Sequence, residues 1–493
     1  MHTIIQELLD NQNVRTNLSN LRKQIKDETA KAELLSLVEE KEDVFLAFLT
    51  HEDAKSRKNA ALLLGDLAYQ PAAEVLYQAY EAETTLFVKA AYLEAMDQMD
   101  VEAYVPKLKE HMTSLASEPV TVENKKHVEE ELRALRKIII SYEGITQHTP
   151  DTEGKKVSVI LLTNRTQRET IRRTITCGQA EVHPLGVLVE TDQLQELMQL
   201  RTYREMVFPL NIQGFLEPNP ISCAKQLWES NLWEILKGLH TESGAFYFRI
   251  EVKSSMTLEE RSNFTKKLAT ELETVSQGAL INSTSDYEVE LRLIANKEGN
   301  LFPCIKLSTI KSQRFAYRKN AIAASIHPST AALIMELAAP YLKENAQIMD
   351  PFCGVGTMLI ERDNRVPARE MYGTDIYGEA IAYARENTQL AGKNINYIHR
   401  DFMDFKHDYL FDEIITNMPL RGKKTRQEMD DFYREFLEKA KTILARDAVL
   451  VMYTNEIGFV KKQLRLQKEY SLLQETCLQP KNDFYLLILG YKR

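Results

Sequence analysis

The feature that most constrains the fold is a regular alternation of short apolar runs and helical runs in the last third of the sequence. From Gln347 onward, the apolar runs are AQIMDPF, EMYGTDI, INYIHRDF, FDEIITN, AVLVMYTN and FYLLILGY, each closing on a loop. Strands that alternate with helices predict right-handed crossovers and a parallel sheet. Ligands of such sheets bind beyond the carboxyl ends of the strands, so functional residues are expected in the loops that follow these runs.

The length of the chain predicts more than one domain. A chain of 493 residues exceeds what one hydrophobic core usually supports, which is roughly 250–300 residues. Changes in texture along the sequence place three domains at 1–148, 155–312 and 313–493, with a linker rich in Gly, Thr and Pro before the second. We expect a multidomain protein with an all-α first domain, an α+β middle and an α/β Rossmann-like last domain.

Charge and cysteine usage limit the functional classes. The formal net charge is −9, so any nucleic-acid surface must be a local patch. The five cysteines are scattered without a CxxC pair, which favours a reducing compartment and argues against a cysteine-bound zinc or a disulfide framework. No metal site is expected. The amino terminus lacks the apolar run of a signal peptide, and no run is long enough to span a membrane, so we expect a cytoplasmic protein.

Residues 1–148 show the periodicity of amphipathic helices and a faint internal repeat. The segments SRKNAALLLGDL and VKAAYLEAMDQM superpose with a shift of 32, which aligns Arg57 with Lys89 and Leu67 with Met99. A repeat of this length predicts stacked helix pairs. The segments resemble HEAT-like repeats, whose usual use is to present a surface to a protein partner. An ordinary helical bundle is the alternative.

The middle region alternates strands and helices in two successive units. The first contains KVSVILLT, a helical run RTQRETIRRTI, HPLGVLVET and a helical run near residues 193–203. The second begins with GAFYFRIEVKSS, continues through the helical run LEERSNFTKKLATELETV, and ends with YEVELRLIAN and LFPCIKLST. Strand-like alternation in FYFRIEV predicts one buried face.

Three loops after the C-terminal strands carry residues suited to an adenosyl cofactor. Gly354 and Gly356 open a helix after the first strand, where glycine lets the backbone approach a ligand. Asp375 ends the second strand, 21 positions after Gly354, where an acid accepts hydrogen bonds from ribose. Asp401 and Phe402 suit an adenine amine and face. A dinucleotide enzyme shares the acid but normally has GxGxxG, so the set favours S-adenosylmethionine.

The motifs DPFCGVGT, GTD, RDF and TNMPL resemble, in order, those of class I S-adenosylmethionine-dependent methyltransferases that modify exocyclic amines. The segment RFAYRKNAIAASIHPSTAALIMELA, from Arg314, is similar to the one that precedes the catalytic domain in THUMP-domain RNA methyltransferases that form N2-methylguanosine. Residues 155–312 fit the ferredoxin-like unit and THUMP-like RNA-binding module of that family in size and texture. The N-terminal third departs from the common architecture of the family.

The resemblance implies a role for each matching residue. Asp350, Gly354 and Gly356 would hold the methionine end of the cofactor, Asp375 the ribose, and Asp401 with Phe402 the adenine. The full set of implied cofactor contacts is Asp350, Phe352, Gly354, Gly356, Thr357, Asp375, Ile376, Asp401, Phe402 and Asn417. The implied catalytic loop is Asn417, Met418, Pro419 and Leu420.

One position departs from the family pattern. The loop usually carries Tyr, Phe or Trp after its proline, and that ring stacks on the flipped base. Here the residue is Leu420, which offers an apolar face without a π-system. Phe432 or Tyr433, in the helix that follows, are candidates to replace the ring. The other interpretation is a silent site, although the cofactor residues and Asn417 are all retained.

Basic runs near these motifs suggest phosphate contacts with RNA. The residues concerned are Arg314, Tyr317, Arg318, Arg421, Lys423, Lys424 and Arg426, with a further basic run at 164–173. His327 and His399 lack metal-ligand spacing, and we assign them no role.

The sequence therefore predicts an RNA methyltransferase that acts on the N2 amine of a guanosine, with structured RNA as its partner and tRNA favoured over ribosomal RNA. The alternatives are a ribosomal RNA guanine-N2 methyltransferase, a catalytically silent RNA-binding or scaffold protein, and a DNA adenine methyltransferase, which the THUMP-like segment disfavours. Residues 1–148 are expected to bind a protein partner, and no membrane contact is expected.

Overall fold

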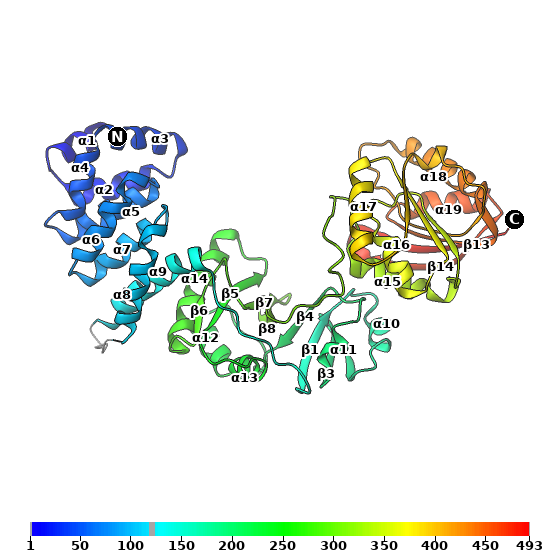
Figure 1. The fold of residues 1–493 in the computed structure, drawn as a ribbon, viewed down its shortest axis with the longest axis horizontal. Helices are drawn as coiled ribbons and strands as arrows, with labels where there is room; N and C mark the ends of the chain where they lie inside the picture. The colour runs from blue at the N-terminus through cyan, green and yellow to red at the C-terminus, as the bar shows by residue number, and fades with distance from the viewer. Residues whose placement is uncertain (1, 118–123, 493) are drawn as a thin grey trace. The chain divides into compact units, whose positions relative to one another are not determined.

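The computed structural model describes residues 2–117 and 124–492, which divide into two compact units (Figure 1). The first unit is Met1–Gln147 with Ser283–Tyr287, and the second is His148–Asn282 with Glu288–Arg493. Within the described residues, no helix combines the length and the apolar character needed to cross a membrane.

Among its described residues up to Glu143, the first unit contains helices and no strand, as the periodicity of the sequence predicts. Its helices are α1 (His2–Leu9), α2 (Val14–Gln24), α3 (Glu28–Glu40), α4 (Glu42–Ala47), α5 (Ala54–Asp66), α6 (Ala73–Ala82), α7 (Leu86–Met96), α8 (Val105–Ser117) and α9 (Lys125–Glu143). The two repeated segments form α5 and α7. These helices approach so closely that a Cβ on Gly65 would lie 2.6 Å from the Cα of Ala95. The HEAT-like assignment stays a prediction.

Ion pairs anchor the repeated helices to the elements that follow them. Arg57 on α5 makes a two-point contact with Glu83, at 2.7 and 2.9 Å. At the aligned position on α7, Lys89 lies 3.6 Å from the buried carboxylate of Glu131 on α9. The aligned cations Arg57 and Lys89 therefore serve the same structural purpose in both segments.

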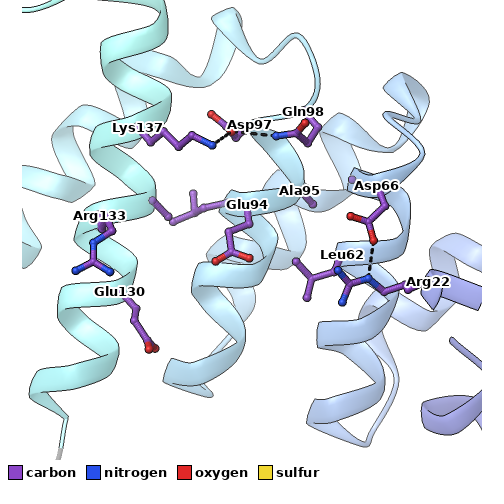
Figure 2. A pocket seen from close by; sticks show the side chains of 13 residues that line it. Arg22, Leu62, Asp66, Glu94, Ala95, Asp97, Gln98, Glu130, Arg133 and Lys137 are labelled. Carbon is purple, nitrogen blue, oxygen red and sulfur yellow. Dashed lines mark hydrogen bonds and ion pairs between the residues drawn. The ribbon is translucent and has the colours of Figure 1, made fainter. Parts of the chain in front are cut away.

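A charged pocket lies on one side of these helices, lined from α2, α5, α7 and α9 (Figure 2). Leu62 and Ala95 contribute its apolar surface. Around them, Arg22 pairs with Asp66 at 2.6 Å, and Lys137 pairs with Asp97. The pocket mixes both signs of charge, and the protein partner expected for this region stays a prediction.

The middle region forms one mixed sheet of order β2-β3-β1-β4-β8-β7-β5-β6. Its strands are β1 (Val157–Leu162), β2 (Gln179–His183), β3 (Gly186–Thr191), β4 (Glu205–Pro209), β5 (Phe246–Lys253), β6 (Leu280–Asn282), β7 (Val289–Ala295) and β8 (Leu301–Leu307). Its helices are α10 (Arg168–Arg173), α11 (Leu194–Leu197), α12 (Pro220–Trp228), α13 (Leu232–Gly238) and α14 (Leu258–Val275). The two expected α+β units are joined because β4 pairs with β8, with Phe208 opposite Ile305.

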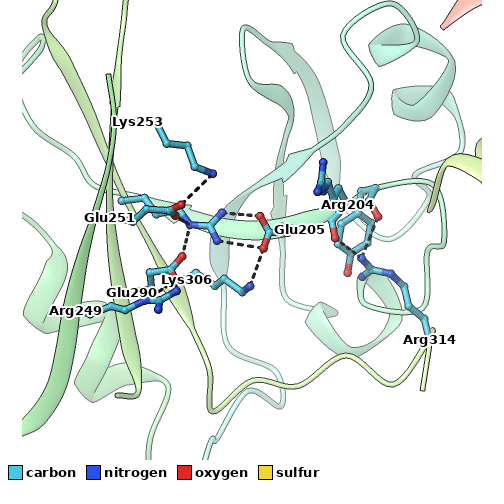
Figure 3. A network of polar contacts seen from close by, with 10 residues as sticks. Arg204, Glu205, Arg249, Glu251, Lys253, Glu290, Lys306 and Arg314 are labelled. Carbon is cyan, nitrogen blue, oxygen red and sulfur yellow. Dashed lines mark hydrogen bonds and ion pairs between the residues drawn. The ribbon is translucent and has the colours of Figure 1, made fainter. Parts of the chain in front are cut away.

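The two faces of this sheet differ in chemistry. Phe246 and Phe248 of β5 belong to the large core that also includes side chains from all five helices. On the opposite face, Arg292 of β7 is 5% exposed and pairs with Glu205 of β4 and with Glu290 and Glu251 (Figure 3). Helices therefore pack on the first face, and ion pairs join the strands on the second.

The C-terminal region contains a sheet of order β11-β10-β9-β12-β13-β15-β14. Its strands are β9 (Gln347–Asp350), β10 (Glu370–Asp375), β11 (Asn396–His399), β12 (Phe411–Asn417), β13 (Leu444–Thr454), β14 (Tyr470–Gln479) and β15 (Phe484–Tyr491). Its helices are α15 (Pro328–Ala338), α16 (Thr357–Arg365), α17 (Gly378–Leu390), α18 (Arg426–Lys441) and α19 (Ile457–Leu466). This is a Rossmann-like α/β fold, and all six predicted strands are present.

One expectation about this sheet is wrong, because not every strand is parallel. The run FYLLILGY forms β15, which pairs antiparallel with both β13 and β14. Strand β14 was not expected, since it lies at the sheet edge and much of its surface is exposed, so its sequence lacks a continuous apolar run. Only the short turn at Pro480–Asn482 joins β14 to β15, and a tight turn permits only antiparallel pairing.

Candidate active site

The switch point of the C-terminal sheet lies at β9, whose neighbours β10 and β12 lead to opposite ends of the strand order. Doubly wound sheets bind ligands at this point, beyond the carboxyl ends of the strands. A pocket is found there, lined by Asp350 at the end of β9, by Asp375 at the end of β10 and by Asn417 at the end of β12. Two of the three loops predicted to hold the cofactor therefore begin at this pocket, together with the predicted catalytic loop.

The loop after β9 is shaped by glycines. Gly354 has φ +50° and Gly356 has φ +82°, in the left-handed region that only glycine enters at little cost. A Cβ on Gly356 would overlap the Tyr397 hydroxyl, so the loop needs glycine for close packing at that position. A Cβ on Gly354 would meet no atom within 4 Å, so the space beside Gly354 is free for a ligand.

Asp375 ties the first loop to the second. Its Oδ2 accepts a hydrogen bond from the backbone N–H of Gly354, at 2.9 Å, and its Oδ1 accepts one from the N–H of Tyr377, also at 2.9 Å. These contacts fix the carboxylate at the pocket wall, where its remaining lone pairs can accept from ribose hydroxyls. Ile376 and Tyr377 follow with 57% and 65% of their surfaces exposed, which provides apolar area beside the carboxylate.

Asp350 is the most strongly perturbed acid in the pocket. It is 1% exposed, and burial, together with the nearby Asp375 charge, raises its pKa from 3.8 to about 7. Its Oδ1 accepts from the Phe352 N–H at 3.1 Å, while its Oδ2 has no hydrogen-bond partner among the described residues. A buried carboxylate oxygen without a partner is costly, and an ammonium group would satisfy it.

The third loop differs from the expectation for adenine. Asp401 is exposed, and its side chain caps the short turn after it by accepting from the Met403 N–H at 2.9 Å. Phe402 is 1% exposed and packs against Phe352 and Phe436, so its ring belongs to the core beneath the pocket. Neither residue lines the pocket, as Phe352 does. Ile376 does not line the pocket either, and the exposed residue after Asp375 that does line it is Tyr377.

The predicted catalytic loop lines the same pocket. Asn417, Met418, Pro419 and Leu420 are all among its lining residues. The Met418 N–H donates to the Tyr453 carbonyl on β13 at 2.9 Å, and the Met418 side chain is 2% exposed, so the loop is anchored at its second residue. Asn417 is therefore held at the end of its strand, with the cofactor loops beside it.

Leu420 is 53% exposed at this pocket. Of the two rings suggested as substitutes, Tyr433 is excluded, because it is fully buried and its hydroxyl is 2.7 Å from Thr454 Oγ1. Phe432 is half-buried, its centroid lies 5.7 Å from that of Phe352, and the Lys424 ammonium lies 4.7 Å from its centroid. Phe432 thus remains the candidate ring.

The connector before α15 forms a wall of the pocket that the site prediction did not include. Ile322, Ala324, Ser325 and Ile326 line it. Asn387 of α17 holds the start of this segment, since its side chain exchanges hydrogen bonds with the backbone of Asn320, both at 3.0 Å. The available signal was the small and apolar run IAASI within the segment that resembles the family. Cys353, Val355, Met358 and Tyr377 are further lining residues that were not predicted.

The residues predicted to contact RNA fall into two groups. Arg421, Lys423, Lys424 and Arg426 are exposed beside the catalytic loop. Arg314, Tyr317 and Arg318 each make contacts inside the unit, and their contact with RNA stays a prediction. Tyr317 is 5% exposed and donates to Glu361 at 2.6 Å, and Arg318 donates to Thr357 Oγ1 at 2.7 Å. Arg314 donates to two backbone carbonyls. These three side chains hold the connector.

Comparison with known proteins agrees with this fold. Residues 316–475 match the UPF0020 family model, described as RMKL-like, methyltransferase domain. The tRNA (guanine(10)-N2)-dimethyltransferase of Methanothermobacter thermautotrophicus is 28% identical over 155 residues, which are 30% of this chain and 45% of that protein. The match therefore spans less than half of the relative.

Two solved structures share the architecture. TrmN from Thermus thermophilus has a TM-score of 0.52 and 18% identity, covering 68% of this chain and 99% of that one. SMU.472, whose structure is complexed with SAH, has a TM-score of 0.50 and 16% identity, covering 69% of this chain and 99% of that one. The C-terminal region therefore matches a methyltransferase-domain family model in sequence and shares the fold of these structures, and the cofactor that this match indicates is S-adenosylmethionine.

The site residues fit this cofactor. The partnerless Oδ2 of Asp350 suits the ammonium group of its methionine end, and the open space beside Gly354 suits a closely bound ligand. Asp375 suits the ribose, and the predicted contact of Ile376 with the cofactor stays a prediction. When bound, the cofactor supplies an electrophilic methyl group on a sulfonium.

We expect cofactor binding to depend on pH through Asp350. The folded-state pKa of this carboxyl lies above its ordinary value, so the cofactor-free protein loses stability as pH rises from about 4 to about 7. The ammonium group is held by the ionised form, so the cofactor dissociation constant should fall several-fold between about pH 6 and pH 7.5. Calorimetric titration at both pH values measures this. The Asp350→Asn variant should bind more weakly without that change, and an equal pH dependence in both proteins would refute the assignment.

Proposed function

We propose that the protein is an S-adenosylmethionine-dependent RNA methyltransferase that modifies the N2 amine of a guanosine, in tRNA rather than ribosomal RNA. The observation that carries the proposal is the convergence of Asp350, Asp375 and the loop from Asn417 to Leu420 on one pocket. The guanine-N2 assignment is supported by the loop motif and by the name of the M. thermautotrophicus relative.

The chemistry suits the residues of the loop. An aryl amine is a poor nucleophile because its lone pair is delocalised into the ring. The Asn417 side-chain oxygen and a main-chain carbonyl of the loop can accept hydrogen bonds from the amine, which localises the lone pair. Alignment of two bound reactants accounts for much of the rate, about 7–11 kcal/mol of barrier in the most favourable cases. The methylated nitrogen carries a surplus proton that is acidic enough to pass to water, so no general base at the amine is required.

The exposed segment that follows the loop suits a nucleic-acid substrate. Arg421, Lys423, Lys424 and Arg426 lie directly after the catalytic loop, and all are exposed. Thr425 and Glu428 form a capping box that stabilises the first turn of α18, and the basic segment leads directly into this turn. Cations in this position can hold the phosphates on either side of a flipped base.

The class of nucleic acid that serves as substrate is tested by incubating the purified protein with radiolabelled S-adenosylmethionine in three parallel reactions. These contain unmodified tRNA transcripts, ribosomal RNA or DNA. Incorporation into tRNA is the expected result. Label in ribosomal RNA alone would establish the alternative RNA substrate, and label in DNA alone would contradict an RNA methyltransferase.

A silent RNA-binding protein is the second candidate, because Leu420 replaces the usual aromatic residue at an exposed position. RNA and cofactor binding without methyl transfer to any of the three polymers, beside an active control enzyme, would favour it.

A further inference from the structure

A second pocket lies in the same unit, outside the cofactor site. It is lined by Tyr203 and Arg204 before β4, by Lys306 on β8, and by Ser312 and Arg314 of the connector. Arg204, Lys306 and Arg314 are labelled in Figure 3. The middle sheet and the connector that leads to the methyltransferase domain both contribute to it. The proposed methyl transfer uses none of these five side chains.

The charges at this pocket do not cancel. Glu205 is the one acid among its lining residues, and its carboxylate accepts from Arg292 at 2.7 and 3.1 Å as well as from Lys306 at 2.7 Å. Arg292 and Lys306 together lower the pKa of Glu205 to about 2, so Glu205 is ionised and its charge is balanced within the network. Positive charge from Arg204 and Arg314 is left over.

Arg204 is exposed, and its side chain makes none of the contacts marked in Figure 3. Arg314 is held in place instead, since it donates to the carbonyls of Tyr203 and Arg204 at 3.0 Å, and its guanidinium carbon lies 3.6 Å from the centroid of the Tyr203 ring. The Arg314 guanidinium is therefore held in place at the pocket, whereas the Arg204 guanidinium can move to bind a ligand.

Two buried donors at the pocket make no hydrogen bond of good geometry, although the Tyr203 hydroxyl lies close enough to Ser312 and Arg314 to interact with them. The Arg314 Nε and the Tyr203 hydroxyl have no partner of hydrogen-bonding geometry among the described residues. Buried donors in native structures are normally paired, so a group that brings acceptor oxygens is expected here. The nearby His327 is consistent with local positive potential, because burial, Arg204, Arg318 and Arg314 lower its pKa, whereas Glu205 alone acts in the opposite direction.

We propose that this pocket binds one phosphodiester group of the RNA backbone, held by Arg204, Arg314 and Lys306. The ligand class follows from the two surplus cations, and the incompletely paired donors agree with it, since phosphate oxygens accept several charged hydrogen bonds at once. The source of the phosphate rests on the RNA substrate proposed above. The site would fix RNA on the middle region while the target base is held in the methyltransferase pocket.

The test measures binding of a fluorescent unmodified tRNA transcript by anisotropy over a series of salt concentrations. Arg204→Ala should weaken binding several-fold and reduce the slope of log K against log salt by about 1, as expected for one lost phosphate contact. Arg204→Glu should weaken it further. Arg465→Ala, which removes an exposed arginine from α19 of the same unit, is the matched control and should leave the slope unchanged.

A second measurement separates this inference from the proposed function. Inorganic phosphate should raise the melting temperature of the wild-type protein above that in chloride of equal ionic strength, and Arg204→Glu should abolish the difference. If the wild type binds tRNA and the Arg204 variants keep its slope, the phosphate site is refuted and the proposed function stands. If the phosphate effect depends on Arg204 but no tRNA binds, the pocket takes free phosphate and both assignments to RNA are refuted.

Discussion

Replacement of Asn417 by alanine is expected to reduce methyl transfer by a factor of about 100 to 1,000, the usual cost of removing one preorganised polar group that acts on developing charge. The reason is the position of Asn417 at the end of β12, in the same pocket as Asp350 and Asp375. Alanine keeps the strand and the Met418 anchor, which is a backbone contact. Turnover at saturating RNA and cofactor measures the effect.

Two comparisons separate loss of chemistry from loss of binding. Calorimetry should show that Asn417→Ala still binds the cofactor, because Asp350 and Asp375 are intact. Asn417→Asp keeps an acceptor oxygen and should retain more activity than alanine. If Asn417→Ala turns over at the wild-type rate, the loop does not position the amine.

Replacement of Arg362 by alanine is expected to lower the free energy of unfolding of the second unit by about 3–5 kcal/mol, because it leaves a buried carboxylate without its cation. Arg362 on α16 and Glu413 on β12 are both fully buried and joined at 2.8 and 2.9 Å. Each also bonds the backbone of Lys343. The pair links the helix that begins at the cofactor loop to the strand that carries Asn417. Denaturant unfolding followed by circular dichroism measures the change.

The matched control is Asp430→Asn, which breaks the more exposed pair with Lys462 at 2.6 Å and should cost about 1 kcal/mol or less. A double replacement, Arg362→Met with Glu413→Leu, removes both charges and should recover much of the lost stability. If Arg362→Ala unfolds like the control, this ion pair does not hold α16 to β12.

The C-terminal fold was largely predictable because its buried strands read as continuous apolar runs, and the loops after them carry Asp350, Asp375 and Asn417. The edge strand β14 was not predictable from the sequence, since a largely exposed strand has no continuous apolar run. Its presence makes β15 antiparallel. Helix α14 was predicted at its observed bounds from its amphipathic pattern, and the structure shows that it begins at a Thr257 capping box.

The side-chain roles were harder to predict, because composition and spacing do not reveal burial. Phe402 follows an acid in a loop, yet three-dimensional packing places its ring in the core. Tyr317 and Arg318 sit in a basic aromatic run that reads as an RNA surface, but Glu361 and Thr357, about 40 positions later, take their polar groups. Such long-range contacts are decided by tertiary packing, which a single sequence does not show.

The most direct test of the central claim identifies the methylated atom. The protein is incubated with S-adenosylmethionine carrying a deuterated methyl group and an unmodified tRNA transcript, and the RNA is digested to nucleosides for mass spectrometry, with Asn417→Ala in parallel. The account predicts deuterated N2-methylguanosine, or its N2,N2-dimethyl form, with wild type and a greatly reduced amount with the variant. Deuterium in another nucleoside, or no labelled nucleoside despite measured cofactor and tRNA binding, would contradict it.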